Sequence, residues 1–334
     1  MGVEVSVILP FYNAGKTLQA AADSILNQSF TNFELLLVNN NSTDKSLLVA
    51  KQLVAKDLRV RLINEPKQGV ANAMNCGLAN ARGDFIARMD ADDISLPRRL
   101  EKQLQYLQNN RETGVVGCHV KYVAHNKNTK GFERFVARVN SFHTPEAISL
   151  NRFVEIPLIN PTIFFRKELF IKYGGNADGD FPEDYEMQLR FLDAGVKMAK
   201  IPEPLLEWHD SETRLTRTDE RYSTEAFFKI KAKYFYKWAV KNNPFHPKIW
   251  VWGAGRKTRQ RAKLLENEGV KINGYIDVVK NKTTQKQTIH FNDIPDKGSF
   301  FIVSMVTSYG AREQIKAFLL AKKYIEGVDF ILMG

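Results

Sequence analysis

The sequence is poor in cysteine and has no long apolar run, and both shortages restrict the class of protein. Its 334 residues include only two cysteines, Cys76 and Cys118, which are too few for a disulfide framework and suit a reducing compartment. Apolar stretches such as residues 300–306 fall far short of the ~20 residues that a membrane-spanning helix needs. No basic segment precedes a long apolar run at the N-terminus, so we expect no signal peptide and a cytoplasmic protein.

Charge is distributed unevenly along the chain. Hydrophobic residues make up 44% and charged residues 25%, which is typical of a globular protein and excludes disordered and collagen-like classes. The formal net charge is +11, but residues 1–235 carry 31 basic and 29 acidic residues, whereas residues 236–334 carry 17 and 8. This basic excess near the C-terminus suits nucleic acid, an anionic membrane surface or a phosphorylated ligand, and composition leaves the three open.

The first part of the chain predicts an α/β domain with a mainly parallel sheet, because short apolar segments alternate with amphipathic ones. In such sheets ligands bind outside the carboxyl ends of the strands. We therefore expect the loops that follow the first four strands to share one rim. The strands are predicted at residues 3–9, 33–38, 59–63 and 84–89, and the helices at residues 16–27, 42–54 and 70–81.

Three carboxylates, those of Asp90, Asp92 and Asp93, follow the fourth predicted strand. Carboxylates this close repel one another unless a cation or hydrogen-bond donors compensate. One interpretation is that Asp92, Asp93 and Ser95 cap a helix beginning near Pro97, where negative charge is favourable. The other is a site for Mg²⁺ or Mn²⁺, which bind carboxylate oxygens and complete their shell with water and substrate phosphates. Basic residues nearby, such as Arg88, would suit a diphosphate.

Several segments, taken in order, resemble family 2 inverting glycosyltransferases over about residues 3–235. The strand and loop at residues 5–13 look like the opening of that family, and Asp90-Ala91-Asp92-Asp93 looks like its DxD motif. Each motif is weak alone, but their order and spacing together are specific. The other matching segments are residues 24–35, 41–44, 69–83, 160–162, 183–186 and 202–206.

The resemblance implies a GT-A fold and the transfer of a sugar from a nucleoside diphosphate to a hydroxyl acceptor, with inversion at the anomeric carbon. A divalent cation, Mn²⁺ or Mg²⁺, would act as a Lewis acid on the leaving diphosphate. By the same resemblance Asp92 is the metal ligand, Asp93 supports it, and Asp90 contacts the ribose or the metal.

A general base is also implied, because an acceptor hydroxyl is a poor nucleophile. Asp184 is favoured for this role, and Glu183 is the alternative or orients the acceptor. Both acids would equally suit the N-terminus of the helix predicted at residues 185–194. His209 is interpreted as a third metal ligand or a diphosphate contact, with an ordinary surface histidine as the alternative.

The donor nucleotide is expected beyond the first two strands. Tyr12 resembles the base-stacking aromatic of the family, and Phe11 is the alternative. The chain departs from the family at residues 39–41, where three asparagines replace the usual aspartates, and at Met74, which replaces an arginine. An asparagine carbonyl still accepts from the N3–H of uracil, so UDP is preferred over GDP and dTDP. The residues expected to bind the donor nucleotide are Pro10, Tyr12, Asn13, Asn40, Asn41, Asn75, Asp90 and Ala91.

A glycine turn indicates a second, smaller α/β domain. Gly253-Ala254-Gly255 follows an apolar strand and precedes a helical segment, and Asp277 ends the next strand, as in a dinucleotide-binding βαβ unit. The third glycine of that pattern is missing, since Thr258 stands in its place. We predict a Rossmann-like domain with a structural or docking role, and nucleotide binding at the turn as the alternative.

Between the two domains, residues 221–240 place aromatic side chains and lysines at helical spacing. A basic amphipathic helix can lie on an anionic membrane, but an aromatic stripe more often packs in a core, and we favour core packing. The predicted organisation is a GT-A domain at residues 1–220, an amphipathic helix and linker at residues 221–247, and the Rossmann-like domain at residues 248–334.

The sequence therefore predicts a metal-dependent, inverting hexosyltransferase with a nucleotide-sugar donor. The resemblance implies a glycan or lipid-linked acceptor in polysaccharide synthesis at a bacterial cell envelope, with peripheral association at the inner face of the membrane left open. A sugar-nucleotidyltransferase is disfavoured, because no glycine- and Arg/Lys-rich triphosphate loop follows the first strand. A non-catalytic nucleotide-sugar-binding assembly protein is the other alternative, and no specific nucleic-acid partner is expected.

Overall fold

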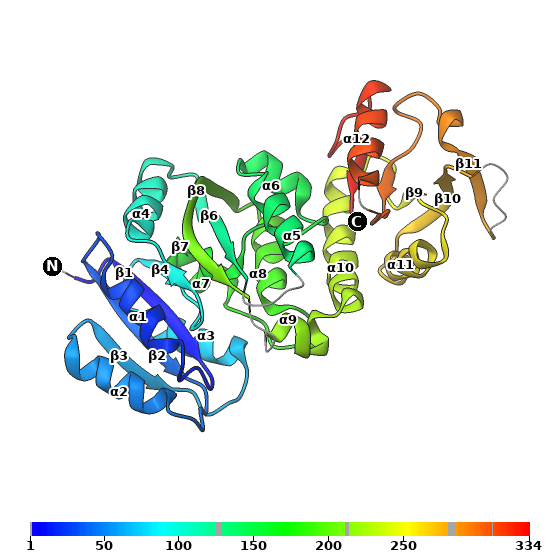
Figure 1. Ribbon diagram of the computed structural model, residues 1–334. Helices are drawn as coiled ribbons and strands as arrows, with labels where there is room; N and C mark the ends of the chain where they lie inside the picture. The colour runs from blue at the N-terminus through cyan, green and yellow to red at the C-terminus, as the bar shows by residue number, and fades with distance from the viewer. Residues whose placement is uncertain (1, 125–128, 211–213, 280–284, 309) are drawn as a thin grey trace. The chain divides into compact units, whose positions relative to one another are not determined.

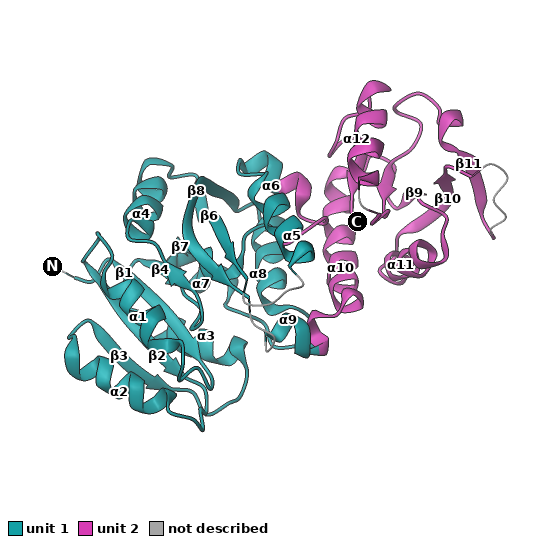
Figure 2. Cartoon of the chain, in the orientation of Figure 1, with its two compact units in different colours: residues 1–148, 157–219 teal, residues 149–156, 220–334 magenta. Residues whose placement is uncertain are grey.

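The computed structural model describes residues 2–124, 129–210, 214–279, 285–308 and 310–334. The chain divides into two compact units (Figure 2). Unit 1 contains residues 1–148 and 157–219, and unit 2 contains residues 149–156 and 220–334. The segment that the sequence suggests as a helix and linker thus groups with the C-terminal sheet.

Unit 1 is built on an eight-stranded mixed sheet with the order β3-β2-β1-β4-β7-β6-β8-β5. Its first four strands in that order are parallel, as the alternating pattern predicts. The other half is mixed, because β7 runs antiparallel to both β4 and β6. The strands are β1 (Val5–Phe11), β2 (Phe33–Asn39), β3 (Val60–Asn64), β4 (Phe85–Arg88), β5 (Ile94–Ser95), β6 (Thr113–Val123), β7 (Phe164–Arg166) and β8 (Lys197–His209).

The core of unit 1 lies between this sheet and its helices (Figure 1). Every residue of β2 is buried, as a strand covered on both faces requires. Helix α3 packs on β1 and β2 through Gly77, where a Cβ atom would lie 2.4 Å from Ile8 Cγ2. The helices are α1 (Leu18–Leu26), α2 (Ser46–Lys56), α3 (Val70–Asn80), α4 (Arg99–Asn109), α5 (Lys130–Asn140), α6 (Pro145–Asn151), α7 (Lys167–Tyr173), α8 (Glu183–Asp193) and α9 (Leu215–Thr218).

Unit 2 contains a second sheet, whose five strands are all parallel in the order β11-β10-β9-β12-β13. The glycine turn follows its central strand, and Gly253 has a φ of 105°, which glycine adopts without strain. The strands are β9 (Lys248–Trp252), β10 (Lys271–Asp277), β11 (Gln287–His290), β12 (Ile302–Ser304) and β13 (Phe330–Leu332), and the helices are α10 (Thr224–Asn242), α11 (Arg256–Asn267) and α12 (Ala311–Ala321).

The aromatic stripe of α10 is core in unit 2. The ring of Phe235 lies 5.8 Å from that of Phe153, and the ring of Trp238 lies 5.8 Å from that of Phe301. Lys231 on the same helix is buried and donates to the carbonyl oxygen of Val154 at 3.1 Å. In the described ranges, no helix is long and apolar enough to cross a membrane.

Candidate functional site

The polar loops of unit 1 meet at the carboxyl ends of its parallel strands. In the sheet register Phe11 is opposite Asn39, and Asn39 is opposite Asn64, so β1, β2 and β3 end at the same edge. The N–H of Met89, just beyond β4, donates to the carbonyl oxygen of Ile8 at 3.0 Å. The rim predicted from the strand pattern is therefore confirmed.

At the end of β1 and in the loop after it, one aromatic side chain is exposed to solvent and the other is buried. Tyr12 is 54% exposed, whereas Phe11 is 3% exposed and belongs to the core. Asn13 next to them has a left-handed φ of 50° and accepts a hydrogen bond from the Thr43 N–H at 2.8 Å. Of the two aromatic candidates for stacking on a base, Tyr12 is the accessible one.

The asparagines after β2 hold a neighbouring loop in place. Asn40 is 3% exposed, and its Nδ2 donates to the carbonyl oxygens of Glu65 and Lys67 at 3.0 and 2.9 Å. Its Oδ1 accepts from the Gly69 N–H at 2.8 Å. Asn41 donates in the same way to a backbone oxygen, that of Pro66, at 2.6 Å. These two amides thus fix residues 65–69 beside the end of β2.

Arg88 links the acidic groups that follow β4 and begin α8. Its guanidinium is buried and donates to Asp90 at 2.9 Å. The amide oxygen of Asn160, in the orientation that satisfies both groups, accepts from Arg88 at 2.7 and 3.1 Å. Burial opposes the charge of Arg88, but the carboxylates of Asp90, Glu183 and Asp184 outweigh it and raise its pKa. The guanidinium of Arg88 is therefore engaged with these acidic groups and is not available to bind a diphosphate.

The remaining acids of the DxD-like motif are poorly compensated. Burial, together with the charge of Asp90, raises the pKa of Asp92, and Arg214 opposes the rise. Asp93 is 1% exposed, and burial together with the charges of Asp92 and Asp90 raises its pKa well above the ordinary value. Its Oδ1 accepts from the His209 N–H at 2.9 Å, and its Oδ2 has no hydrogen-bond partner among the described residues.

The capping interpretation of these acids is wrong. Helix α4 begins at Arg99, with Arg98 at the N-cap position and no side-chain cap hydrogen bond. Asp93 cannot reach that cap because its carboxylate is bonded to the backbone at the end of β8. The alternative of a cation site gains support, since a buried carboxylate oxygen without a donor favours a positively charged ligand.

The structure brings His209 to this acidic loop, because the end of β8 lies beside it. The His209 Nε2 atom lies 3.8 Å from Glu207 Oε2. Within the part of the chain that the structure describes, no group of three or more His, Cys, Asp or Glu side chains is arranged to hold a metal ion. Mg²⁺ and Mn²⁺ sites often use one or two carboxylates and complete their shell with substrate phosphates, so these residues fit such an ion.

Asp184 lies in the first turn of α8, where the helix dipole favours negative charge. Its Oδ1 accepts from the Tyr185 N–H at 2.7 Å. Burial and the adjacent charge of Glu183 raise the pKa of Asp184 to about 7, although Arg88 acts in the opposite direction. A carboxylate with this pKa exchanges a proton near neutral pH, as a general base requires.

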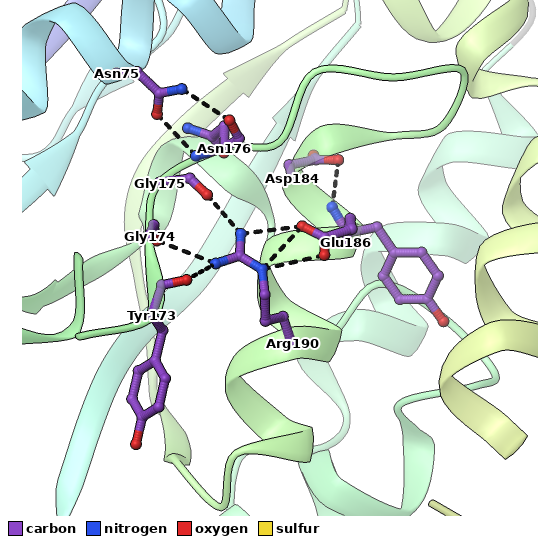
Figure 3. A network of polar contacts seen from close by, with 9 residues as sticks. Asn75, Tyr173, Gly174, Gly175, Asn176, Asp184, Glu186 and Arg190 are labelled. Atoms are coloured by element: carbon purple, nitrogen blue, oxygen red, sulfur yellow. Dashed lines mark hydrogen bonds and ion pairs between the residues drawn. The ribbon is translucent and has the colours of Figure 1, made fainter. Parts of the chain in front are cut away.

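A clamp that the sequence analysis missed holds the loop after α7 (Figure 3). Asn75 and Asn176 exchange two hydrogen bonds of 2.8 Å, one through each backbone group of Asn176. Arg190 donates to the carbonyl oxygens of Tyr173, Gly174 and Gly175, and its partner on α8 is Glu186 at 3.0 Å. The only sequence signal for this clamp is the four-residue spacing of the Glu and Arg on one helix face.

The match to known proteins covers most of unit 1. The family model described as Glycosyl transferase family 2 matches residues 6–174. EpsE of Bacillus subtilis (strain 168), which is named as a glycosyltransferase, is 33% identical over 233 residues, covering 67% of this chain and 79% of EpsE. The O-antigen biosynthesis glycosyltransferase WbnJ of Escherichia coli is 30% identical over 220 residues, covering 63% and 82% of the two chains.

Solved structures show the same fold at lower identity. S. aureus TarS in complex with UDP-GlcNAc has a TM-score of 0.57 at 16% identity, covering 79% of this chain and 71% of that one. The mannosyltransferase PcManGT of Pyrobaculum calidifontis, in complex with GDP-Man and Mn²⁺, has a TM-score of 0.52 at 19% identity, covering 80% and 69%. Unit 1 therefore has the GT-A fold, and the chain belongs to glycosyl transferase family 2.

Proposed function

We propose that this glycosyltransferase moves a hexose-type sugar from UDP to a hydroxyl acceptor, with inversion and with a divalent cation. The observation that carries the proposal is the pair of acids, Glu183 and Asp184, in the first turn of α8, on which the charge of Arg88 at the end of β4 acts. Burial and Glu183 raise the pKa of Asp184 to about 7. Glu183, buried beside it, is assigned to orienting the acceptor.

The acceptor hydroxyl oxygen attacks the anomeric carbon while its proton passes to a carboxylate oxygen of Asp184. The bond from the anomeric carbon to the diphosphate oxygen breaks in the same step, so a single displacement inverts the configuration. Arg88 holds Asp90 in place and offsets part of the negative charge around Asp184. This keeps the base partly deprotonated at neutral pH.

Asp92 and His209 would hold the cation, with Asp93 in support. The uncompensated acids of this loop support that assignment. A bound Mg²⁺ or Mn²⁺ would compensate the charge of the leaving diphosphate. The Mn²⁺ complex of the mannosyltransferase PcManGT agrees with this proposal.

The nucleotide is proposed to lie across the ends of β1 and β2. Exposed Tyr12 would stack on the base, and the loop that Asn40 and Asn41 fix would form one side of the pocket. Pro10, Asn13, Asn75, Asp90 and Ala91 complete the proposed donor site. UDP is preferred because TarS binds UDP-GlcNAc, and GDP is the alternative because PcManGT binds GDP-Man.

The acceptor is proposed to be a growing polysaccharide or a lipid-linked glycan, in a cytoplasmic enzyme that associates peripherally with the inner face of the cell membrane. The name of WbnJ, an O-antigen biosynthesis enzyme, supports an acceptor of this kind. The +9 of residues 236–334, from 17 basic and 8 acidic residues, supports contact with an anionic surface.

A donor screen tests the proposal. The full chain is incubated with several nucleotide sugars and Mn²⁺, and release of the nucleoside diphosphate is measured with and without glycan acceptors. We expect turnover of a UDP-sugar that requires the metal and is lost in Asp92→Asn. Tight nucleotide-sugar binding without turnover of any donor would instead favour a non-catalytic assembly protein.

A further inference from the structure

Unit 2 contains a cavity of about 550 Å³ beside α11 that the proposed transferase site does not use. Helix α11 forms one wall, and Tyr275 of β10 together with Gln285 and Lys286, which precede β11, forms the other. Apart from Glu266, the charged side chains that line it within the described ranges are basic. The lining residues are Arg256, Arg259, Gln260, Lys263, Glu266, Tyr275, Gln285 and Lys286.

This groove lies beside a crossover helix of the sheet in unit 2. Helix α11 is the crossover between β9 and β10, and β11 extends the sheet beyond β10 on the side away from β9. Helix α10 contacts α11 elsewhere, where Arg261 lies over the ring of Phe228 at 4.1 Å, and none of the described lining residues of the groove comes from a second helix.

The cations of the groove are arranged along one face of α11. Arg256, Arg259 and Lys263 lie three and four residues apart, so they follow one helix face over about 10 Å. None of these three side chains has a hydrogen bond or ion pair with any residue of the described ranges. At the far end Lys286 is neutralised by Glu266, at 2.5 Å. The unpaired charge is thus concentrated near the N-terminal half of the helix.

A buried polar group lies in the wall of the groove. Tyr275 on β10 is 5% exposed and lines the cavity opposite α11. The glycine turn itself is less available, because the Ala254 N–H already donates to Asp277 Oδ2 at 2.8 Å. The basic face of α11, and not the glycine turn, is therefore where an anion would be bound.

We propose that this groove binds the diphosphate group of a ligand. Two adjacent phosphates match cations spread along the helix better than a single phosphate does, since each guanidinium pairs with its own oxygen atoms. The source is either a soluble nucleoside diphosphate or a lipid-linked diphosphate in a membrane. The groove lies in unit 2, so the proposal that it binds a diphosphate can be tested independently of the transfer reaction proposed for unit 1.

Calorimetry on the full chain, with inorganic pyrophosphate in the presence of EDTA, tests the site. The groove variant Arg259→Glu reverses one charge of the lining, and Lys257→Glu, which reverses one charge of the same helix outside the lining, is the matched control. We expect the groove variant to weaken pyrophosphate binding by about tenfold or more and the control to change it less than about twofold. Asp92→Asn is expected to leave this binding unchanged, which separates the groove from the donor site.

Two further titrations distinguish the sources. UDP in solution is compared with phosphatidylcholine vesicles that contain a polyprenyl diphosphate, and vesicles with phosphatidylserine of equal charge are the control. Binding that depends on the groove residues and favours either diphosphate supports the proposal. Equal losses in Lys257→Glu and the groove variant, or tighter binding to an oligonucleotide than to pyrophosphate, would overturn it.

Discussion

The two units of this protein use the same kind of parallel sheet but manage charge in opposite ways. In unit 1, the buried guanidinium of Arg88 pairs with Asp90, and the site also contains the buried carboxylates of Asp93 and Glu183. In unit 2, Arg256 and Lys263 are exposed on a helix face and have no ion pair within the described residues. Buried charges need compensation and shift in pKa, which suits catalysis, whereas exposed cations without an ion pair suit the binding of anions.

The two units also differ in the role of the aspartate at the end of a parallel strand. Asp90 follows β4 in unit 1, and its carboxylate pairs with a side chain, Arg88. Asp277 ends β10 in unit 2, and its carboxylate accepts from the backbone N–H groups of Ala254 and Val279. An aspartate at the end of a parallel strand is thus part of a charged site in one unit and a support for a turn in the other.

The strongest test of the comparison removes the proposed base of unit 1. Asp184→Asn keeps the size of the side chain but cannot accept a proton, so we expect donor turnover to fall by about a hundredfold to ten-thousandfold. Asp84→Asn is the matched control, because Asp84 is exposed just before β4, at the opposite end of the strand from the acidic loop. Equal activity of the two variants would contradict the assignment of Asp184.

The second test compares how transferase activity in unit 1 and anion binding in unit 2 depend on pH. Burial and Glu183 raise the pKa of Asp184 to about 7, so the deprotonated fraction falls as the pH decreases through this value. We expect kcat/KM to fall about tenfold per pH unit below about 7. Sulfate binding to the groove of unit 2 is the comparison, and we expect it not to follow this pH profile, because Asp184 is not part of the groove. A flat activity profile would remove Asp184 as the base.

The clamp in unit 1 is expected to contribute to stability. Arg190→Ala removes hydrogen bonds to three backbone oxygens and leaves Glu186, which is buried, without this cation. We expect the free energy of unfolding of unit 1 to fall by about 2 kcal/mol, measured by urea denaturation. Arg111→Ala, at an exposed arginine, should change it by less than about 0.5 kcal/mol.

The smallest effect concerns how a helix begins in each unit. Ser223 in unit 2 caps α10, since its side chain accepts from the Ala226 N–H at 3.2 Å. Ser223→Ala should lower the free energy of unfolding of unit 2 by about 1 kcal/mol. Thr17 occupies the corresponding position before α1 in unit 1 but makes no cap hydrogen bond, so Thr17→Ala should have a smaller effect in the same denaturation experiment.

Local patterns predicted much of unit 1 because strands and amphipathic helices are encoded by neighbouring residues. The helix predicted at residues 70–81 is α3 (Val70–Asn80), and the loops of the first four strands share the expected rim. The reversed direction of β7 was not predictable in this way, since it depends on pairing with β4 and β6, which are distant in sequence.

Long-range contacts also explain what the sequence could not predict in the site. The amide of Asn40 is bonded to residues 65–69, and the carboxylate of Asp93 is bonded to the backbone of His209. Nothing near Asp93 in the sequence distinguishes a helix cap from a buried acid beside β8. Only the tertiary structure separates the two interpretations.

By itself, the sequence determined the order of the elements, the acids after β4 and at the start of α8, and the concentration of basic residues near the C-terminus. The tertiary structure decided which of these charges are compensated. The charge of Arg88 at the end of β4 acts on Glu183 and Asp184 at the start of α8, which are far away along the chain. Arg256, Arg259 and Lys263 of α11 have no hydrogen bond or ion pair with any side chain of the described ranges. The physical reason is that a pKa, or an anion site, depends on the distance and burial of groups that are far apart along the chain.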